Sequence, residues 1–166
     1  MTATLRPFTK ADTDWLVALH ATIYGAEEGF DETFPVLVRQ ILDTFVQDAE
    51  ARPPPRQAGW VAEDATGDGG QRLGSIFCVE ESPDVAKLRL FVLEPRARGT
   101  GLAQAMMDTC LAFARGAGFY RMRLWTHESH LAACRLYLRN GFRCVESQKA
   151  RSFGQDVVTQ IWERDL

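Results

Sequence analysis

The segment EPRARGTGLAQ, residues 94–104, constrains the fold of this chain more than any other stretch. It places two arginines and two glycines between an apolar run and a run whose apolar residues recur at helical spacing. Gly99 and Gly101 can adopt conformations that other residues rarely adopt, and they let a ligand approach the main chain. The first amides of a helix have no intrahelical partner and its dipole is positive there, so Arg96 and Arg98 would add charge to an anion site. The segment therefore predicts a strand, a turn and a helix start that together bind a phosphate-bearing ligand.

Other phosphate motifs fit this segment less well. A P-loop requires GxxxxGK[ST], which the sequence lacks. A dinucleotide fingerprint would need a glycine where Gln104 stands, although Glu128 could imitate its ribose-binding acid. An ordinary strand-to-helix turn, with arginines for solubility, is the remaining alternative.

Length and composition predict one small domain. The chain has 166 residues, of which 46% are hydrophobic, and we expect residues 1–166 to form a single domain with one core. No apolar signal region follows the start, and no stretch approaches the roughly 18 apolar residues of a membrane helix, so we expect a cytoplasmic protein without a membrane partner. The net charge of −3 argues against a nucleic-acid partner. Four cysteines without a CxxC pair are expected to be reduced and to fill the core, namely Cys78, Cys110, Cys134 and Cys144.

Apolar periodicity and glycine or proline breakers predict the order β-α-α-β-β-β-α-β-α-β-β, an α/β protein around one central sheet. The predicted strands cover about residues 3–7, 58–63, 72–80, 85–93, 120–126, 142–149 and 157–163. The predicted helices cover about residues 11–24, 32–51, 102–116 and 130–140. The prolines of RPPPR stop the second helix, and the glycines of DATGDGG suit a hairpin loop within an antiparallel meander.

Charge is unevenly distributed along the chain. Residues 11–50 contain nine acids against one lysine or arginine, and residues 87–123 contain seven lysines and arginines against two acids. One half could receive a cation and the other an anion, or both could be solvated faces of ordinary helices and strands.

Two motifs resemble a known family. RARGTG is similar to the (Q/R)-x-x-G-x-(G/A) acyl-coenzyme A motif of the GNAT superfamily of N-acetyltransferases, and AACRLYLRNGF resembles the family's A-x-x-x-Y-x-x-x-G-F helix and turn. The resemblance implies a GNAT-like fold, with a mixed, mostly antiparallel sheet of about seven strands flanked by four helices. YGAEEGFDETFPVLV and SFGQDVVTQIWERDL further resemble acetyltransferase domains fused behind MarR-type regulators. Because the chain begins at the first predicted strand, we expect no DNA-binding domain.

The resemblance implies that acetyl-CoA is the co-substrate and that no metal takes part. The backbone of residues 96–102 would hold the pyrophosphate, and the strand before it would run beside the pantetheine arm. His130 departs from the family pattern, which often has asparagine there. The implied cofactor-binding residues are Phe91, Val92, Leu93, Arg96, Ala97, Arg98, Gly99, Thr100, Gly101, Leu102 and His130.

The resemblance also implies a catalytic acid, Tyr137, which would protonate the departing thiolate; the alternative is a core aromatic. An alkylammonium must lose a proton before attack, and we prefer Glu28 as the base over Glu27, Asp31 and Glu94. These acids could instead cap and solubilise the second helix. Their joint presence suits a cationic amine. The expected substrate-binding residues are Tyr24, Glu28, Phe30, Asp31, Phe34 and Trp125.

The sequence thus predicts direct acetyl transfer to a primary amine within a ternary complex. The acceptor is a small molecule or a protein, for which we expect an enclosed aromatic pocket or an open acidic groove respectively, and the protein could be a homodimer. A non-catalytic module that binds acyl-CoA or a partner protein is the alternative. A zinc site at His127, His130 and Cys134 is a lesser one, because a fourth ligand is not evident.

Overall fold

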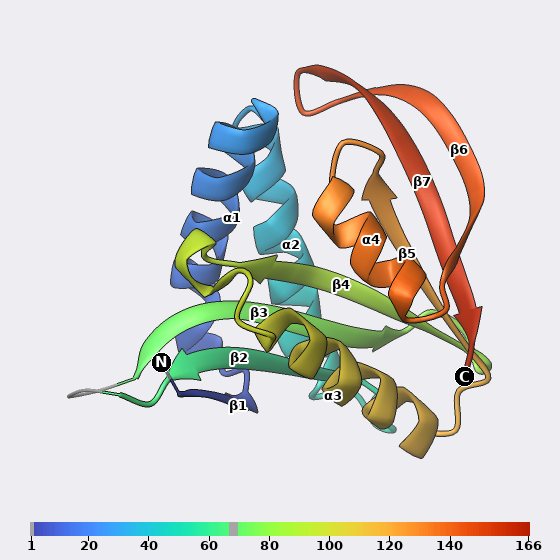
Figure 1. Ribbon diagram of the computed structural model, residues 1–166. Helices are drawn as coiled ribbons and strands as arrows, with labels where there is room; N and C mark the ends of the chain where they lie inside the picture. The colour runs from blue at the N-terminus through green and yellow to red at the C-terminus, as the bar shows by residue number, and fades with distance from the viewer. Residues whose placement is uncertain (1, 67–69) are drawn as a thin grey trace.

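The computed structural model describes residues 2–66 and 70–166 and contains one seven-stranded sheet with helices on both faces (Figure 1). The strands are β1 (Ala3–Pro7), β2 (Ala58–Asp64), β3 (Gln71–Glu80), β4 (Val85–Leu93), β5 (Arg121–His127), β6 (Arg143–Ser152) and β7 (Gln155–Asp165). The helices are α1 (Thr13–Glu28), α2 (Thr33–Asp48), α3 (Leu102–Gly116) and α4 (Leu131–Arg139). This order confirms the predicted one. The centre of the predicted DATGDGG hairpin loop, residues 67–69, lies outside the described residues.

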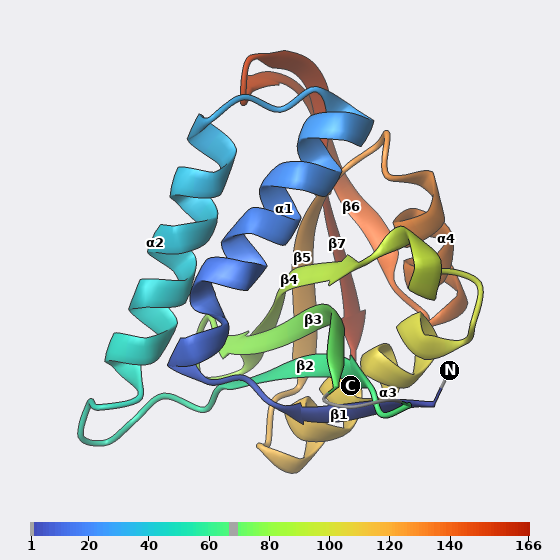
Figure 2. The ribbon, with the colours of Figure 1, turned by 90° about the vertical axis from the view of Figure 1, so that its left-hand side faces the viewer.

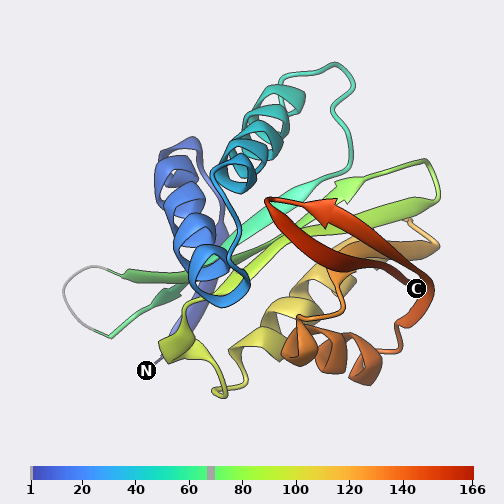
Figure 3. The same ribbon diagram turned by 90° about the horizontal axis from the view of Figure 1, so that it is seen from above.

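The sheet has the order β1-β2-β3-β4-β5-β7-β6, and every neighbouring pair is antiparallel except β4 and β5. The predicted mixed, mostly antiparallel sheet and the meander β2-β3-β4 are therefore confirmed. Helices α1 and α2 cover one face, and α3 and α4 cover the other (Figures 2 and 3). Across the described ranges, no helix combines the length and apolarity needed to cross a membrane.

The two parallel strands at the centre of the sheet separate part-way along their length. β4 pairs with β5 only from Val85↔Arg121 to Leu88↔Leu124. Beyond that point β4 remains paired with β3, and β5 remains paired with β7. A bulge in β4 accompanies the separation: Leu90 has a φ of 49°, and the Ser75 hydroxyl donates a hydrogen bond of 2.7 Å to its carbonyl oxygen. The sheet therefore has a gap between β4 and β5 at one end.

Each face of the sheet has its own apolar cluster. Met106, Met107 and Cys110 of α3 are buried against one face, and Leu16 of α1 and Leu42 of α2 are buried against the other. Burial of this kind is worth roughly 1.5–3 kcal/mol for each large side chain, so it fixes both helix pairs on the sheet.

The four cysteines differ in burial. All four are free thiols; Cys78 and Cys110 are buried and Cys134 is half-buried. The prediction that all four fill the core is wrong for Cys144, which is exposed on the edge strand β6.

Helix α1 is one turn longer than predicted. The sequence places its end near Tyr24, before Gly25, but the helix continues to Glu28 and ends at Gly29, whose φ of 70° is left-handed. A glycine inside a helix costs only about 1 kcal/mol, whereas the left-handed position after a helix favours glycine strongly. Glu28 is therefore in the last turn of α1 and not in the connection to α2.

The hairpin of β6 and β7 reaches over to the α1–α2 connection (Figure 2). The backbone amide of Asp31 donates to the Phe153 carbonyl at 3.0 Å, and Gln155 Nε2 donates to the Gly29 carbonyl at 3.0 Å. These bonds join segments far apart in sequence beside the cavity described next.

Candidate active site

The glycine-arginine segment forms an open loop before α3. A short 3-10 turn, Pro95–Ala97, is followed by Gly99 and Gly101, whose φ values of 73° and 85° are left-handed. A Cβ atom added to either glycine would meet no protein atom within 4 Å. The Thr100 hydroxyl donates to the Ala97 carbonyl at 2.6 Å, and α3 begins at Leu102. The loop therefore presents a helix N-terminus beside space that a ligand could occupy.

The two arginines of this loop are paired with carboxylates at the surface. Arg96 Nε lies 2.6 Å from Glu94 Oε2, and Arg98 Nη1 lies 2.6 Å from Glu27 Oε1. The second pair ties the last turn of α1 to the loop. Exposed pairs of this kind contribute about 0–1 kcal/mol, so an anionic ligand can compete for both guanidinium groups.

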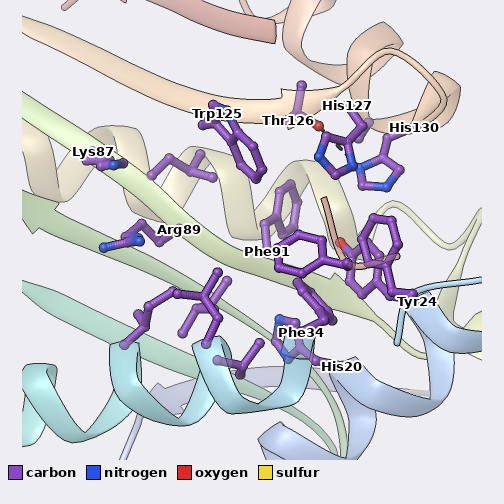
Figure 4. A pocket seen from close by; sticks show the side chains of 18 of the residues that line it. His20, Tyr24, Phe34, Lys87, Arg89, Phe91, Trp125, Thr126, His127 and His130 are labelled. Carbon is purple, nitrogen blue, oxygen red and sulfur yellow. Dashed lines mark hydrogen bonds between the residues drawn. The ribbon is translucent and has the colours of Figure 1, made fainter. Parts of the chain in front are cut away.

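A cavity of about 380 Å³ lies between α1, α2, β4 and β5 (Figure 4). Its wall is mainly aromatic and includes Tyr24, Phe30, Phe34, Phe91, Trp125, Tyr137 and Phe153. Tyr137 belongs to α4, on the opposite face of the sheet from α1 and α2. The cavity therefore extends to the gap between β4 and β5.

Tyr137 is nearly enclosed. The residue is 5% exposed, and its ring lies 5.8 Å from that of Phe142 and 6.3 Å from that of Trp162, centroid to centroid. Burial raises the pKa of its hydroxyl well above 10, so the group stays protonated. Within residues 2–66 and 70–166, the hydroxyl has no hydrogen-bond partner.

Three histidines line the same cavity. His20 Nδ1 lies 2.9 Å from the Leu16 carbonyl, and burial lowers the pKa of His20 to about 4. His127 is 2% exposed, and burial, with His130 as a lesser cause, lowers its pKa to about 4. Neither ring nitrogen of His127 has a hydrogen-bond partner among the residues that the structure describes. His127 is thus a neutral imidazole whose polar atoms are unsatisfied.

Glu28 lies behind His130 rather than in the cavity wall. Its Oε1 is 3.2 Å from His130 Nε2, a close contact that lacks hydrogen-bond alignment, and its Oε2 accepts a bond of 2.8 Å from Ser129. His130 Nδ1 lies 3.3 Å from the Thr126 hydroxyl. Burial lowers the pKa of His130, and the charge of Glu28 opposes that shift.

The other predicted acids do not face the cavity. Asp31 Oδ1 accepts hydrogen bonds from the Thr33 amide, at 3.0 Å, and from the Thr33 hydroxyl, so it stabilises the start of α2. Glu27 is held by Arg98. The described cavity wall contains no carboxylate, which differs from the expected acidic surroundings of a cationic amine.

The structure brings most of the remaining predicted residues to two neighbouring places. Those that line the cavity are Tyr24, Phe30, Phe34, Phe91, Trp125, His130 and Tyr137. Those of the loop and of the strand leading to it are Val92, Leu93, Arg96, Ala97, Arg98, Gly99, Thr100, Gly101 and Leu102.

The cavity residues that were not predicted include His20, Lys87, Arg89 and Phe153. Lys87 and Arg89 did carry a signal, because charged residues at alternate positions of a predicted inner strand are unusual in a sheet covered on both faces. Nothing local to Phe153 indicates its place.

No metal-binding group is found in the described parts of the chain, where three or more His, Cys, Asp or Glu side chains do not gather. His127, His130 and Cys134, considered above as zinc ligands, therefore do not form such a group.

Comparison with known proteins identifies the family. The model of the acetyltransferase (GNAT) family matches residues 23–142, which include the glycine-arginine loop and the tyrosine helix α4. The chain belongs to this family. Among curated relatives of this GNAT protein, it is 31% identical over 110 residues to mycothiol acetyltransferase of Geodermatophilus obscurus, covering 53% of the chain and 36% of the relative. It is 38% identical over 108 residues to N-acetyltransferase 8B of Rattus norvegicus, covering 62% of this chain and 43% of the relative. The chain spans less than half of the length of these relatives.

Solved GNAT structures have the same fold. An acetyltransferase of the GNAT family from Staphylococcus aureus aligns with a TM-score of 0.79 at 14% identity, covering 99% of both chains. A GCN5-related N-acetyltransferase from Kribbella flavida aligns with a TM-score of 0.76 at 22% identity, covering 99% of this chain and 98% of that one. Together with the family match, the relatives support an acyltransferase.

Acetyl-CoA, which the GNAT family uses, is compatible with the residues present. The glycines of the loop leave open space at a helix N-terminus, where backbone amides favour phosphate. The gap between β4 and β5 leads from that side of the sheet to the aromatic cavity.

Proposed function

We propose that this GNAT protein is an acetyl-CoA-dependent N-acetyltransferase that moves the acetyl group directly to a primary amine of a small molecule within a ternary complex. The observation that carries this proposal is the gap between β4 and β5, where Tyr137 from one face of the sheet reaches a cavity on the other. Two substrates that enter from opposite faces can meet there.

The loop and the separated strand would hold acetyl-CoA. The backbone of residues 96–102 binds the pyrophosphate, with Arg96 and Arg98 as additional cations. Beyond Leu88, the side of β4 that faces β5 has no strand partner, so its backbone groups from Phe91 to Leu93 can pair with the pantetheine arm.

The reaction proposed for the cavity is acyl transfer. A neutral amine attacks the thioester carbonyl, a backbone amide near Phe91 or Leu93 stabilises the oxyanion, and the carbon–sulfur bond breaks as the carbonyl re-forms. The attacking nitrogen, which carries a positive charge after the attack, gives up a proton that replaces the one Tyr137 donates. Tyr137 donates a proton to the sulfur that leaves as an anion. The raised pKa of Tyr137 keeps that proton in place before the reaction.

The amine loses its proton on the histidine side of the cavity. His127 has two unpartnered nitrogens and can accept a hydrogen bond from the amine. The proton would reach His130 Nδ1 through the Thr126 hydroxyl, which lines the cavity and lies 3.3 Å from that nitrogen. Glu28, 3.2 Å from Nε2, would act through His130 by stabilising the imidazolium that forms. This arrangement gives Glu28 an indirect role in place of direct contact with the amine.

The shape of the cavity supports a small acceptor. It is walled by aromatic side chains, and the hairpin that carries Phe153 is bonded to the α1–α2 connection beside it. A protein lysine would be expected to need an open groove, whereas a volume of about 380 Å³ suits a small molecule.

Calorimetric titration with acetyl-CoA, followed by thiol-release assays on a panel of amines, tests the proposal. We expect micromolar binding that is lost for pantetheine fragments without phosphate, and CoA release that depends on an amine. Binding without release for any amine would favour a non-catalytic acyl-CoA-binding module. Absence of binding would refute both functions.

We also propose a homodimer and a relationship to the acetyltransferase domains fused behind MarR-type regulators, both on the resemblance described above. Sedimentation of the purified chain tests the homodimer, and a monomer at micromolar concentration would contradict it.

A further inference from the structure

The inner strand β4 places two cations in the wall of the acceptor cavity. Lys87 and Arg89 occupy alternate positions, so their side chains project from the same face of the strand, and both line the cavity. Figure 4 shows both residues at the end of the cavity away from His127 and His130.

Neither cation is in direct contact with a carboxylate. Over the described ranges, Lys87 and Arg89 form no ion pair and no side-chain hydrogen bond, although the charge of Glu81 acts on both from a greater distance. Arg123, opposite Lys87 on β5, is in contrast paired with Glu81 at 3.7 Å and Glu163 at 3.3 Å. The cavity therefore has a basic end, and Glu81, the carboxylate whose charge acts on it, is paired with Arg123 instead.

Comparable arginines elsewhere have partners. Arg6, Arg56 and Arg72 have side chains that are about one third exposed, and each contacts a carboxylate at 2.7–3.3 Å. Partial burial of a cation costs free energy unless an opposite charge or hydrogen bonds offset it. Burial likewise lowers the pKa of Lys87, with Arg89 as the next cause, and burial lowers the pKa of Arg89, while the charge of Glu81 opposes both shifts. Among the half-buried lysines and arginines of the described residues, Lys87 and Arg89 are the two whose side chains form neither an ion pair nor a hydrogen bond.

We propose that Lys87 and Arg89 bind an anionic group of the acceptor, so that the acceptor is a small amine that also carries a carboxylate or another oxyanion. This inference rests on the proposed function, because it assigns the substrate class of the same cavity. The amine lies toward Phe91 and the histidines, the apolar part lies against the aromatic wall, and the oxyanion lies against Arg89 and Lys87. Arg89 and Phe91 both line the cavity and are separated by the bulged residue Leu90, so an anion separated from the amine by a ring or short chain fits this arrangement.

Matched pairs of amines test this substrate class. Aminomethylbenzoate and benzylamine differ by a distant carboxylate, phenylalanine and phenylethylamine differ by an adjacent one, and aminomethylphenylphosphonate replaces the carboxylate by a phosphonate. For the wild type, we expect kcat/KM to be at least about 10-fold higher for the better anionic amine than for its neutral partner, since hydrogen bonds to charged groups are the stronger ones. Comparing the pair with the distant carboxylate and the pair with the adjacent one measures the preferred spacing between the amine and the anion. Comparing the phosphonate with the carboxylate shows which oxyanion is preferred.

Substitutions test whether Lys87 and Arg89 cause the preference for the anionic amine. Arg89→Gln and Lys87→Gln should each lower kcat/KM for the anionic amine by about 10- to 100-fold, leave the neutral amine within about 3-fold, and leave KM for acetyl-CoA unchanged. Arg89→Lys should retain part of the preference. Arg115→Gln removes the same charge at the exposed end of α3 and serves as the control.

Several results would overturn the inference. Equal kcat/KM for both members of every pair, or a preference that survives both Gln substitutions, would show that the cations do not select the acceptor. A rise in KM for acetyl-CoA would assign them to the coenzyme instead. If no amine releases CoA, the proposed function fails, and the anion site is then decided by calorimetric binding of aminomethylbenzoate to the CoA-saturated protein: binding that Arg89→Gln abolishes supports the site, and absence of binding refutes it.

Discussion

Removing one oxygen atom from Tyr137 tests the catalytic proposal most directly. In Tyr137→Phe the ring keeps its contacts with Phe142 and Trp162, and the lost hydroxyl has no partner in the described protein. The substitution should therefore leave the free energy of unfolding unchanged or slightly higher, since a buried hydroxyl without a partner contributes little. During the reaction, however, the hydroxyl would face a leaving thiolate. A hydrogen bond to a charged group is worth about 1.5–3 kcal/mol, which corresponds to a fall in kcat of about 10- to 100-fold.

The assay is steady-state thiol release with acetyl-CoA and the best amine, combined with calorimetry of CoA binding and thermal denaturation. General acid catalysis by complete proton transfer would give a larger fall, about 100- to 10,000-fold, so the size of the effect separates the two modes. Tyr120→Phe is the matched control, because Tyr120 is 73% exposed before β5. An unchanged kcat, or a loss of CoA affinity equal to the loss of kcat, would refute the role of Tyr137 as an acid.

Three further predictions concern the loop and a buried histidine. Replacing Arg96 and Arg98 together by alanine should weaken CoA binding several-fold at low salt and less at high salt, which calorimetry at two ionic strengths measures. Unchanged affinity would show that the pyrophosphate binds elsewhere. Gly101→Ala should lower the free energy of unfolding by about 1–2 kcal/mol in urea titrations because of its left-handed φ, and should weaken CoA binding further because its Cβ enters the open space beside the loop. Burial lowers the pKa of His20 from 6.5 to about 4, so the unfolded chain binds this proton first as pH falls. The free energy of unfolding should therefore drop by up to about 3 kcal/mol between pH 6.5 and 4, and His20→Leu should remove that part; an equal drop in the variant would contradict the assignment.

The loop and its neighbouring elements could be predicted because their signals are local. The glycines of RARGTG are needed where the backbone is left-handed, and the arginines stand beside a helix start, so a short segment determines both conformation and charge. The end of α1 shows the limit of this reasoning. By local sequence alone, either Gly25 or Gly29 could end the helix, and α1 ends at Gly29.

Much of the cavity could not be predicted from sequence because it depends on long-range contacts. Phe153 meets Phe30 and Phe34 at centroid distances of 4.9 Å only because the β6–β7 hairpin is bonded to the α1–α2 connection. The role of the acids before α2 could not be predicted either. Helix capping and catalysis both use carboxylates at such a position, and in the structure Asp31 caps α2.

The gap between β4 and β5 connects these features physically. A central strand that loses its neighbour leaves backbone groups without a ladder partner, and the proposed pantetheine arm would supply partners on that side of β4. The same gap lets the protonated Tyr137 reach the cavity, where His127 is neutral and a weak base for an ammonium. The stronger acceptor of the ammonium proton would be His130, because the charge of Glu28, 3.2 Å from its Nε2, stabilises the imidazolium. Lys87 and Arg89, at the other end of the cavity, would select the acceptor by its anion, so separate groups would carry out recognition and proton removal.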